Sequence, residues 1–167
     1  MPQITTCLWF DGKALEAAEF YVSVFPNARI TDVQRSLVDT PGDGAKTGDV
    51  LTVAFELDGK PFLGLNGGPA FQFNEAISLM IDCDDQAEVD YYWDAFLNAG
   101  GAPSACGWLK DRFGLSWQVT PKGLLEMIRD PDAAKAKRAF EAMMGMVKLD
   151  IAALRTAFEG QEQTAGR

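Results

Sequence analysis

Near its start the chain reads Ile4-Thr5-Thr6-Cys7-Leu8-Trp9-Phe10-Asp11, and the same pattern returns at Ile77-Ser78-Leu79-Met80-Ile81-Asp82-Cys83-Asp84. With a one-residue gap, the aromatic pair Phe20-Tyr21 falls on Tyr92-Trp93. A repeat of whole supersecondary units constrains the architecture more than any single motif does. The sequence therefore predicts two similar modules, each of which begins with a strand and a helix.

The first module is expected to have the order β-α-β-β-β. Apolar residues at helical spacing follow Asp11-Gly12 and predict a helix that Pro26-Asn27 ends. Asp58-Gly59 is the strongest hairpin signal in the chain. A polar loop is expected at residues 39–49, and strands are expected at residues 4–10, 29–37, 50–57 and 61–65.

The second module begins in the same order. Asp84-Asp85 is expected to cap a helix that Gly100-Gly101 ends, and a turn at Arg112-Phe113-Gly114 is expected between two strands. The strands are expected at residues 76–83, 108–110 and 116–120, and further helices at 124–128, 133–146 and 149–158. This pattern predicts an α+β domain over residues 1–121 with modules 1–66 and 74–121, C-terminal helices over 122–159 and a flexible tail over 160–167.

Composition excludes several classes of protein. The 167 residues are 47% hydrophobic and 23% charged, which are values of a globular chain, and the formal net charge of -9 argues against nucleic-acid or anionic-membrane partners. Nothing resembles a signal peptide or a membrane span. Cys7, Cys83 and Cys106 are an odd, scattered set, so we expect a cytoplasmic protein in which each is a small buried hydrophobe.

Five stretches carry a resemblance to a known family. They are Phe10-Asp11-Gly12, Ala17-Ala18-Glu19-Phe20-Tyr21, Phe73-Asn74-Glu75-Ala76-Ile77-Ser78-Leu79, Cys106-Gly107-Trp108-Leu109-Lys110-Asp111-Arg112-Phe113-Gly114-Leu115-Ser116-Trp117-Gln118-Val119 and Lys148-Leu149-Asp150-Ile151-Ala152-Ala153-Leu154. On these residues the chain resembles the PhnB-like branch, also labelled demethylubiquinone 3-methyltransferase-like, of the vicinal oxygen chelate (glyoxalase/bleomycin-resistance) superfamily. The resemblance implies a curved sheet from each module, together forming a half-barrel around a central cavity.

Metal-dependent members of that superfamily place a His or Glu from each of four strands in the cavity. The resemblance puts three of these positions on Thr5, Ser78 and Gln118, and the fourth near Asn66. The chain has no histidine, and all four side chains are neutral, which suits neither zinc nor a hard divalent ion. We therefore expect no metal and no cofactor.

The strand register implied by the resemblance points Thr5, Cys7 and Trp9 into the cavity, and turns Thr6, Leu8 and Phe10 toward the helix. A hollow lined by aromatic side chains, hydroxyls and amides suits a small-molecule ligand. In the alternative interpretation, Trp9, Phe73 and Trp108 simply fill the barrel as core. The expected ligand-binding residues are Thr5, Cys7, Trp9, Asn66, Phe71, Phe73, Ser78, Cys106, Trp108 and Gln118.

Without histidine, any acid–base chemistry depends on carboxylates, thiols or amines whose pKa is shifted. Asp82 is one candidate, since burial could raise its pKa. Asp111 and Arg112 could position a substrate or a general acid, but in the alternative interpretation they fix the tight turn at Phe113-Gly114. Whether the protein is an enzyme stays open.

Three functions follow. The first is metal-free binding of a small apolar or aromatic molecule, with or without catalysis. The second is non-catalytic sequestration, as in resistance proteins of the superfamily. The third is methyl transfer to a quinone precursor, but the sequence has no glycine-rich turn between a strand and a helix that would bind a nucleoside cofactor. We also expect a homodimer, unless the C-terminal helices fold back on their own chain, with an interface formed by Phe140, Met143, Met144, Ile151 and Leu154.

Overall fold

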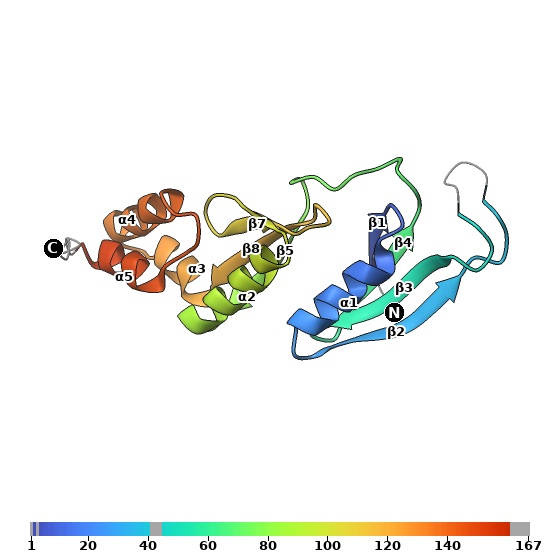
Figure 1. The fold of residues 1–167 in the computed structure, drawn as a ribbon. Helices are drawn as coiled ribbons and strands as arrows, with labels where there is room; N and C mark the ends of the chain where they lie inside the picture. The colour runs from blue at the N-terminus through green and yellow to red at the C-terminus, as the bar shows by residue number, and fades with distance from the viewer. Residues whose placement is uncertain (1, 3, 41–44, 161–167) are drawn as a thin grey trace. The chain divides into compact units, whose positions relative to one another are not determined.

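A computed structural model describes residues 2, 4–40 and 45–160 (Figure 1). These residues form an α+β fold with two four-stranded mixed sheets, which confirms the predicted class and the paired modules. The chain divides into two compact units between Phe73 and Asn74. No helix in the described part of the chain is long and apolar enough to cross a membrane.

The first unit has the predicted β-α-β-β-β order. Its sheet has the order β1-β4-β3-β2, in which β1 runs parallel to β4 and the other pairs are antiparallel. Asp58 and Gly59 both have positive φ, 47° and 71°, as a two-residue hairpin turn requires. The elements are β1 (Thr6–Phe10), α1 (Ala14–Val24), β2 (Ala28–Arg35), β3 (Val50–Leu57) and β4 (Lys60–Asn66).

The second unit repeats this topology. Its sheet has the order β5-β8-β7-β6, and β5 is again parallel to β8. The short strand β6 was not predicted, because two residues are too few to show alternation. The elements that match the first unit are β5 (Ser78–Cys83), α2 (Gln86–Asn98), β6 (Ala102–Pro103), β7 (Trp108–Lys110) and β8 (Ser116–Pro121).

Equivalent positions of the repeat have equivalent burial. Leu8 and Phe10 of β1 are buried, and so are Ile81 and Cys83, their equivalents in β5. Tyr21 of α1 is fully buried, and Trp93, its predicted equivalent in α2, is 5% exposed. Each first strand therefore turns alternate side chains toward its helix, as a period of two requires. Thr6, which was expected against the helix, is exposed as the first residue of β1.

The C-terminal segment forms three helices, α3 (Lys122–Ile128), α4 (Ala133–Met144) and α5 (Ile151–Glu159). Asp132 caps α4 by accepting hydrogen bonds from the backbone N–H groups of Ala134 and Lys135. Gly145 ends α4 two residues before the predicted boundary, and Gly160 ends α5 in the left-handed conformation. The predicted tail beyond Gly160 lies outside the described residues.

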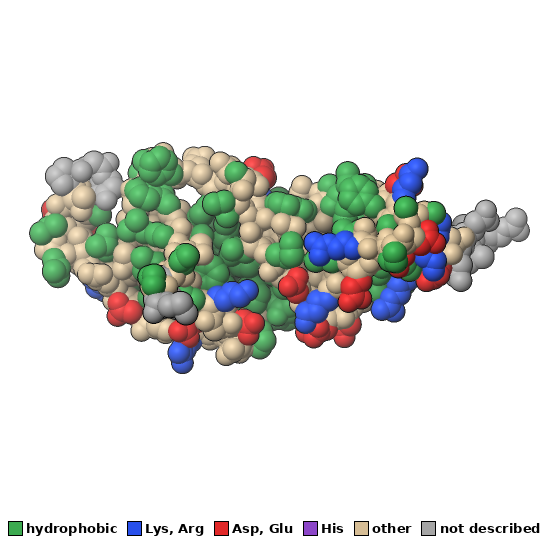
Figure 2. Space-filling view, turned by 180° about the vertical axis from the view of Figure 1, so that it is seen from behind, with side chains coloured by type: hydrophobic (Ala, Val, Ile, Leu, Met, Phe, Trp, Pro, Cys, Tyr) green, Lys and Arg blue, Asp and Glu red, His purple; other side chains and the backbone are tan. Residues whose placement is uncertain are grey.

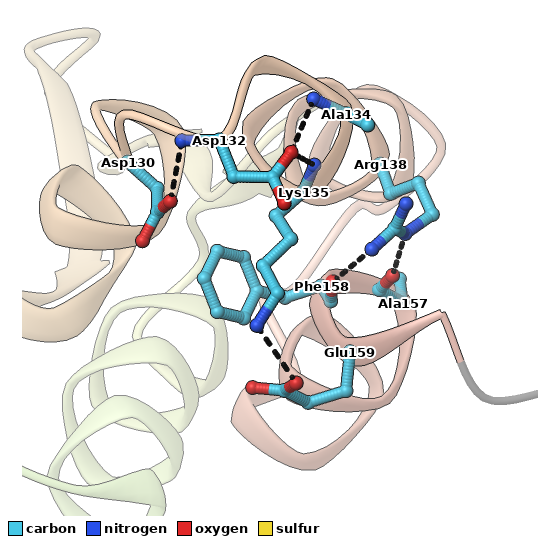
Figure 3. A network of polar contacts seen from close by, with 8 residues as sticks. All are labelled: Asp130, Asp132, Ala134, Lys135, Arg138, Ala157, Phe158 and Glu159. Atoms are coloured by element: carbon cyan, nitrogen blue, oxygen red, sulfur yellow. Dashed lines mark hydrogen bonds and ion pairs between the residues drawn. The ribbon is translucent and has the colours of Figure 1, made fainter.

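A polar network joins α4 to the end of α5 (Figure 3). The Arg138 guanidinium donates to the carbonyl oxygens of Ala157 (3.0 Å) and Phe158 (2.7 Å) in the last turn of α5, where carbonyl groups need partners from outside the helix. Lys135 forms a 3.1 Å ion pair with Glu159. These contacts fix the crossing of the two helices.

Backbone and side-chain contacts attach the C-terminal segment to the second unit. The N–H groups of Cys106 and Gly107 each donate at 2.8 Å, to the carbonyl oxygens of Met146 and Val147. The Gln86 side chain, at the start of α2, donates to Leu149 O (3.2 Å) and accepts from Ile151 N (2.9 Å). The segment is thereby held against both the turn before β7 and the helix α2.

The structure changes the predicted role of part of the C-terminal apolar face. Leu154 is fully buried, and together with Leu124 and Leu149 it forms a cluster against which Met143 packs. The predicted interface included Met143 and Leu154, but α3 covers this side of α4 and α5 within the same chain. Phe140 stays 49% exposed and Met144 57% exposed.

Replacing Leu154 with alanine is expected to lower the free energy of unfolding by about 2–5 kcal/mol, because it leaves a cavity among α3, α4 and α5. Leu125→Ala, the same change at a side chain that is 38% exposed, is the control and should cost clearly less. Urea unfolding followed by tryptophan fluorescence measures both losses. Equal losses would contradict the packing described above.

Candidate functional site

The first unit has an open sheet face, on the side opposite α1. Register pairs Cys7 with Leu63 and Trp9 with Leu65, so these four side chains share that face. Cys7 is exposed and the other three are half-buried. Seen from behind, hydrophobic side chains gather on the surface of this unit (Figure 2). An apolar sheet face without a covering helix is a candidate binding surface.

Trp9 is held in place on this face by three contacts. Its indole Nε1 donates to the carbonyl oxygen of Gly68 at 2.8 Å. A Cβ on Gly67 would lie 2.3 Å from Cζ2 of the indole, so only glycine allows this close approach. The exposed Phe71 ring meets the indole edge-on, with 5.0 Å between centroids. The indole is therefore fixed before any ligand arrives.

Three residues expected beside Trp9 have other surroundings. Thr5 precedes β1 and is exposed. Asn66 pairs with Phe10 and so lies on the α1 face, where it accepts from Ala14 N and donates to Val50 O, both at 2.9 Å. Phe73 packs edge-on against Phe10 at 5.2 Å, as the core interpretation predicts.

The open face of the second sheet is more polar. Trp117 packs on Phe96 of α2, so the alternate residues Ser116 and Gln118 of β8 face away from that helix. Gln118 Nε2 donates to Ser78 Oγ at 2.8 Å, so the structure brings together two of the four positions implied by the resemblance. Trp108 lies beside Gln118 on the neighbouring strand β7.

An ion pair flanks this face. Lys110 of β7 lies at the position paired with Ser116, and its ammonium is 2.5 Å from a carboxylate oxygen of Glu75. The hydrogen bond from Lys110 lowers the pKa of Glu75 below its usual value. Both side chains are solvent-exposed for a large part of their surface, so the pair contributes little to stability.

Ser116 was missed as a candidate. It is 1% exposed, and its Oγ has no hydrogen-bond partner among the described residues. The alternation of Ser116, Trp117 and Gln118 puts it on the same face as Gln118, and this signal was present in the sequence. Its burial depends on how neighbouring strands pack, which the sequence does not show.

The three cysteines differ in burial. Burial raises the pKa of the Cys83 thiol to about 12, so it stays protonated as expected of a buried hydrophobe. Cys7 is exposed, so the expectation of burial is wrong there, because it lies on the face that α1 does not cover. Cys106 is half-buried in the turn before β7, with Sγ 3.8 Å from Met144 Sδ. It thus contacts the C-terminal helices.

Asp111 is buried and accepts hydrogen bonds within its own turn and from β8. Its carboxylate is 4% exposed and accepts hydrogen bonds from the N–H groups of Phe113 (2.9 Å) and Leu115 (3.0 Å), and from the indole of Trp117 (2.9 Å). Gly114 completes the turn with a φ of 90°. These contacts match the interpretation in which Asp111 fixes the turn.

The two other catalytic candidates lack the geometry expected of them. The Arg112 guanidinium lies 4.9 Å from the centroid of the Phe113 ring. Asp82 is exposed on the open face of β5, so the burial on which its candidacy depended is absent.

A pocket of about 600 Å³ on the α1 side of the first unit has carboxylates of Asp11 and Glu19 in its lining, and it was not predicted.

The residues present do not fit the superfamily metal. Both polar atoms of Asn66 are already bonded on the α1 face, and Gln118 and Ser78 bond each other. Thr5 offers a single neutral hydroxyl. Hydroxyl and amide side chains without an imidazole, thiolate or carboxylate among them are poor ligands for zinc, nickel or manganese. Among the described residues, no three His, Cys, Asp or Glu side chains come together as a metal-binding group.

A family model described as 3-demethylubiquinone-9 3-methyltransferase matches residues 2–120. The chain belongs to this family. The match covers both modules and ends before α3, so the C-terminal helices lie outside it. The PhnB-like membership predicted from the sequence is confirmed. No curated protein is similar enough to the chain to count as a match.

The chain is also similar to several solved structures. The PhnB protein from Bacillus cereus is 34% identical, covers 72% of this chain and 99% of its own, and has a TM-score of 0.62. Protein PA1353 from Pseudomonas aeruginosa is 20% identical, with coverage of 70% and 95% and a TM-score of 0.52, which shows the fold alone. The fosfomycin resistance protein FosX from Mesorhizobium loti is 13% identical, with coverage of 70% and 87% and a TM-score of 0.46.

Asp111→Asn is expected to lower the free energy of unfolding by about 1.5–3 kcal/mol or more, because it weakens hydrogen bonds to a buried charged acceptor. Asp82→Asn, the same change at an exposed carboxylate, should alter stability by less than about 0.5 kcal/mol. Chemical unfolding measures both. If Asp111→Asn left stability unchanged, the carboxylate would not be fixing the turn.

Proposed function

We propose that this protein binds a small, partly apolar or aromatic molecule without a metal, using the open faces of its sheets. The observation that carries this proposal is the fixed indole of Trp9, which presents an aromatic surface beside Leu65 and the exposed Phe71. Rigid aromatic side chains on an open face suit stacking against an apolar ligand, because little side-chain freedom is lost on binding.

The second sheet supports the same function with different chemistry. Trp108 offers an aromatic ring next to the polar pair of Gln118 and Ser78, and Met80 of β5 is 51% exposed on the same face. Binding sites for small molecules combine apolar lining with a few placed polar groups. Cys7, Trp9 and Phe71 in the first unit, with Ser78, Trp108 and Gln118 in the second, are the proposed ligand contacts.

The surroundings of the catalytic candidates give little support for a reaction of the bound ligand. Asp111 is occupied by three donors, and Arg112 lies against Phe113. On the open face of the second sheet, the Ser78 hydroxyl is bonded to the amide of Gln118, which is not a base. Non-catalytic sequestration therefore remains an alternative that uses the same contacts.

Methyl transfer, which the family description names, has weaker support. A nucleoside cofactor is usually held by a glycine-rich turn between a strand and a helix. The turn between β1 and α1 has one glycine, Gly12, and the turn between β5 and α2 is Asp84-Asp85. The order β1-β4-β3-β2 is also not that of a doubly wound parallel sheet. A cytoplasmic location stays a prediction.

The test is a screen of small aromatic compounds by ligand-observed NMR on the full chain, before and after dialysis against EDTA. We expect saturable binding that dialysis leaves unchanged, and no stoichiometric metal by elemental analysis. Trp9→Ala should weaken binding about fivefold or more, since stacked rings contribute about 0.5–1.5 kcal/mol beyond their buried area. Tyr91→Ala, at an exposed ring on α2, is the control. Binding that needs a metal would contradict the proposal.

We propose further that the protein forms a homodimer through the exposed part of α4. Phe140 and Met144 lie four residues apart, so they share one side of the helix, and Val147, just beyond it, is 53% exposed. Twofold dimers are the most frequent oligomers of soluble proteins, and exposed apolar patches often form their interfaces.

Phe140→Glu with Met144→Glu is expected to convert the dimer to a monomer, because two carboxylates from each protomer would be buried together in an apolar contact. Light scattering on the full chain measures the mass. Tyr91→Glu on α2 is the matched control and should leave the dimer intact. A full-length monomer at all concentrations would rule out this interface.

A further inference from the structure

We propose that Ser116, Ser78 and Gln118 form a donor-rich subsite that accepts a carbonyl oxygen of an aromatic ligand. This inference rests on the proposed function and names the chemical class of the ligand at the second sheet. The observation behind it is the hydroxyl of Ser116, a buried polar group without a partner among the described residues. Buried polar groups in folded proteins nearly always have a partner, so an orphan one indicates a partner that is missing.

Strand pairing gathers the three side chains. Ser116 of β8 is the register partner of Ser78 on β5, and Gln118 lies two residues further along the same face of β8. The 2.8 Å hydrogen bond from Gln118 Nε2 to Ser78 Oγ confirms that these side chains reach one another. The hydroxyl of Ser116 is therefore next to an existing polar pair.

A count of donors and acceptors indicates the chemistry of the ligand. Gln118 uses one of its two N–H groups on Ser78, whose own hydroxyl proton then remains to donate. The hydroxyl proton of Ser116 and the second N–H of Gln118 likewise lack partners among the described residues. Three donors are therefore available, and the acceptors beside them are the amide oxygen of Gln118 and the remaining lone pairs of the two serine hydroxyls, so the cluster can donate to an acceptor of a ligand.

The charges nearby favour a neutral acceptor over a carboxylate. The residue paired with Ser116 on β7 is the cation Lys110, and Glu75 already pairs with it. Asp82 lies further along the same face of β5, and the whole chain carries a net charge of -9. An anion would be repelled, whereas a carbonyl oxygen can accept two hydrogen bonds without charge.

The surroundings provide both access and an aromatic contact. Lys110 occupies the position on β7 paired with Ser116, so its side chain lies on the same face as the hydroxyl, and its exposed ion pair with Glu75 can break at small cost. Trp108 lies opposite Gln118 on the same strand pair, which places an indole directly beside the amide and two residues along the strand from Ser116. An aromatic ring bearing a carbonyl would then stack on Trp108 with its oxygen toward Ser116.

The experiment uses four probes of similar size on the full-length protein: acetophenone, ethylbenzene, benzoate and 1-phenylethylamine. Dissociation constants come from NMR titration, and stability comes from thermal unfolding without ligand. We expect acetophenone to bind most tightly, and Ser116→Ala to weaken it up to about tenfold while leaving ethylbenzene unchanged. Because Ser116 lacks a partner, the same variant should match or exceed the unfolding temperature of the natural chain.

Ser36 is the matched control, since it is also buried but donates at 2.6 Å to the carbonyl oxygen of Val38. Ser36→Ala should lower the unfolding temperature and leave the affinity for acetophenone unchanged. If Ser116→Ala raises stability but the preference for acetophenone over ethylbenzene persists, the hydroxyl is only an unsatisfied core group and this inference fails. If the four probes bind equally, the inference fails while the proposed function stands. If none binds, both fail.

Discussion

Among the described residues of each unit, a helix packs on one face of the sheet and leaves the other face open, and the placement of the candidate residues depends on that asymmetry. In the first unit, α1 buries Leu8 and Phe10 of β1 and leaves Cys7 and Trp9 on the other side. In the second, Phe96 of α2 packs on Trp117 and leaves Ser116 and Gln118 facing away. Because side chains alternate along a strand, covering one face determines which residues can meet a ligand.

The two open faces differ in chemistry although their topology is the same. The first is apolar and has a clamped indole, with Leu63 and Leu65 beside it. The second has two serines, an amide and an ion pair around Trp108. The repeated module thus keeps its pattern of buried positions, since each helix must pack on its sheet, although the residues at those positions differ, and the open faces differ in polarity as well.

The C-terminal helices add a second layer of constraint. They lie beyond the residues that match the family model, and they close over Leu124, Leu149 and Leu154 within their own unit. Backbone hydrogen bonds from Cys106 and Gly107, in the turn before β7, attach these helices to the second sheet. The apolar faces of the C-terminal helices, which have no evident partner in the sequence, therefore have a buried side within the chain and an exposed side.

The amino-acid sequence by itself determined the repeat, the element order and the face of each first strand. These features depend on local spacing, such as the apolar alternation of Leu8 and Phe10 or the Asp58-Gly59 turn, which acts over a few residues. It also left two interpretations of Asp111, because a carboxylate in a turn has the same pattern whether it binds substrate or backbone.

Tertiary structure alone decided how side chains distant in the sequence are paired. Asn66 was expected in a cavity, yet its side-chain amide forms hydrogen bonds with Ala14 and Val50 on the α1 face. The reason is that Asn66 of β4 pairs with Phe10 of β1, and paired residues lie on the same face of a sheet. Ser116 had no signal of burial, since its exposure depends on β5 and β7 lying on either side. Burial and hydrogen bonding come from contacts across strands, and no local pattern records them.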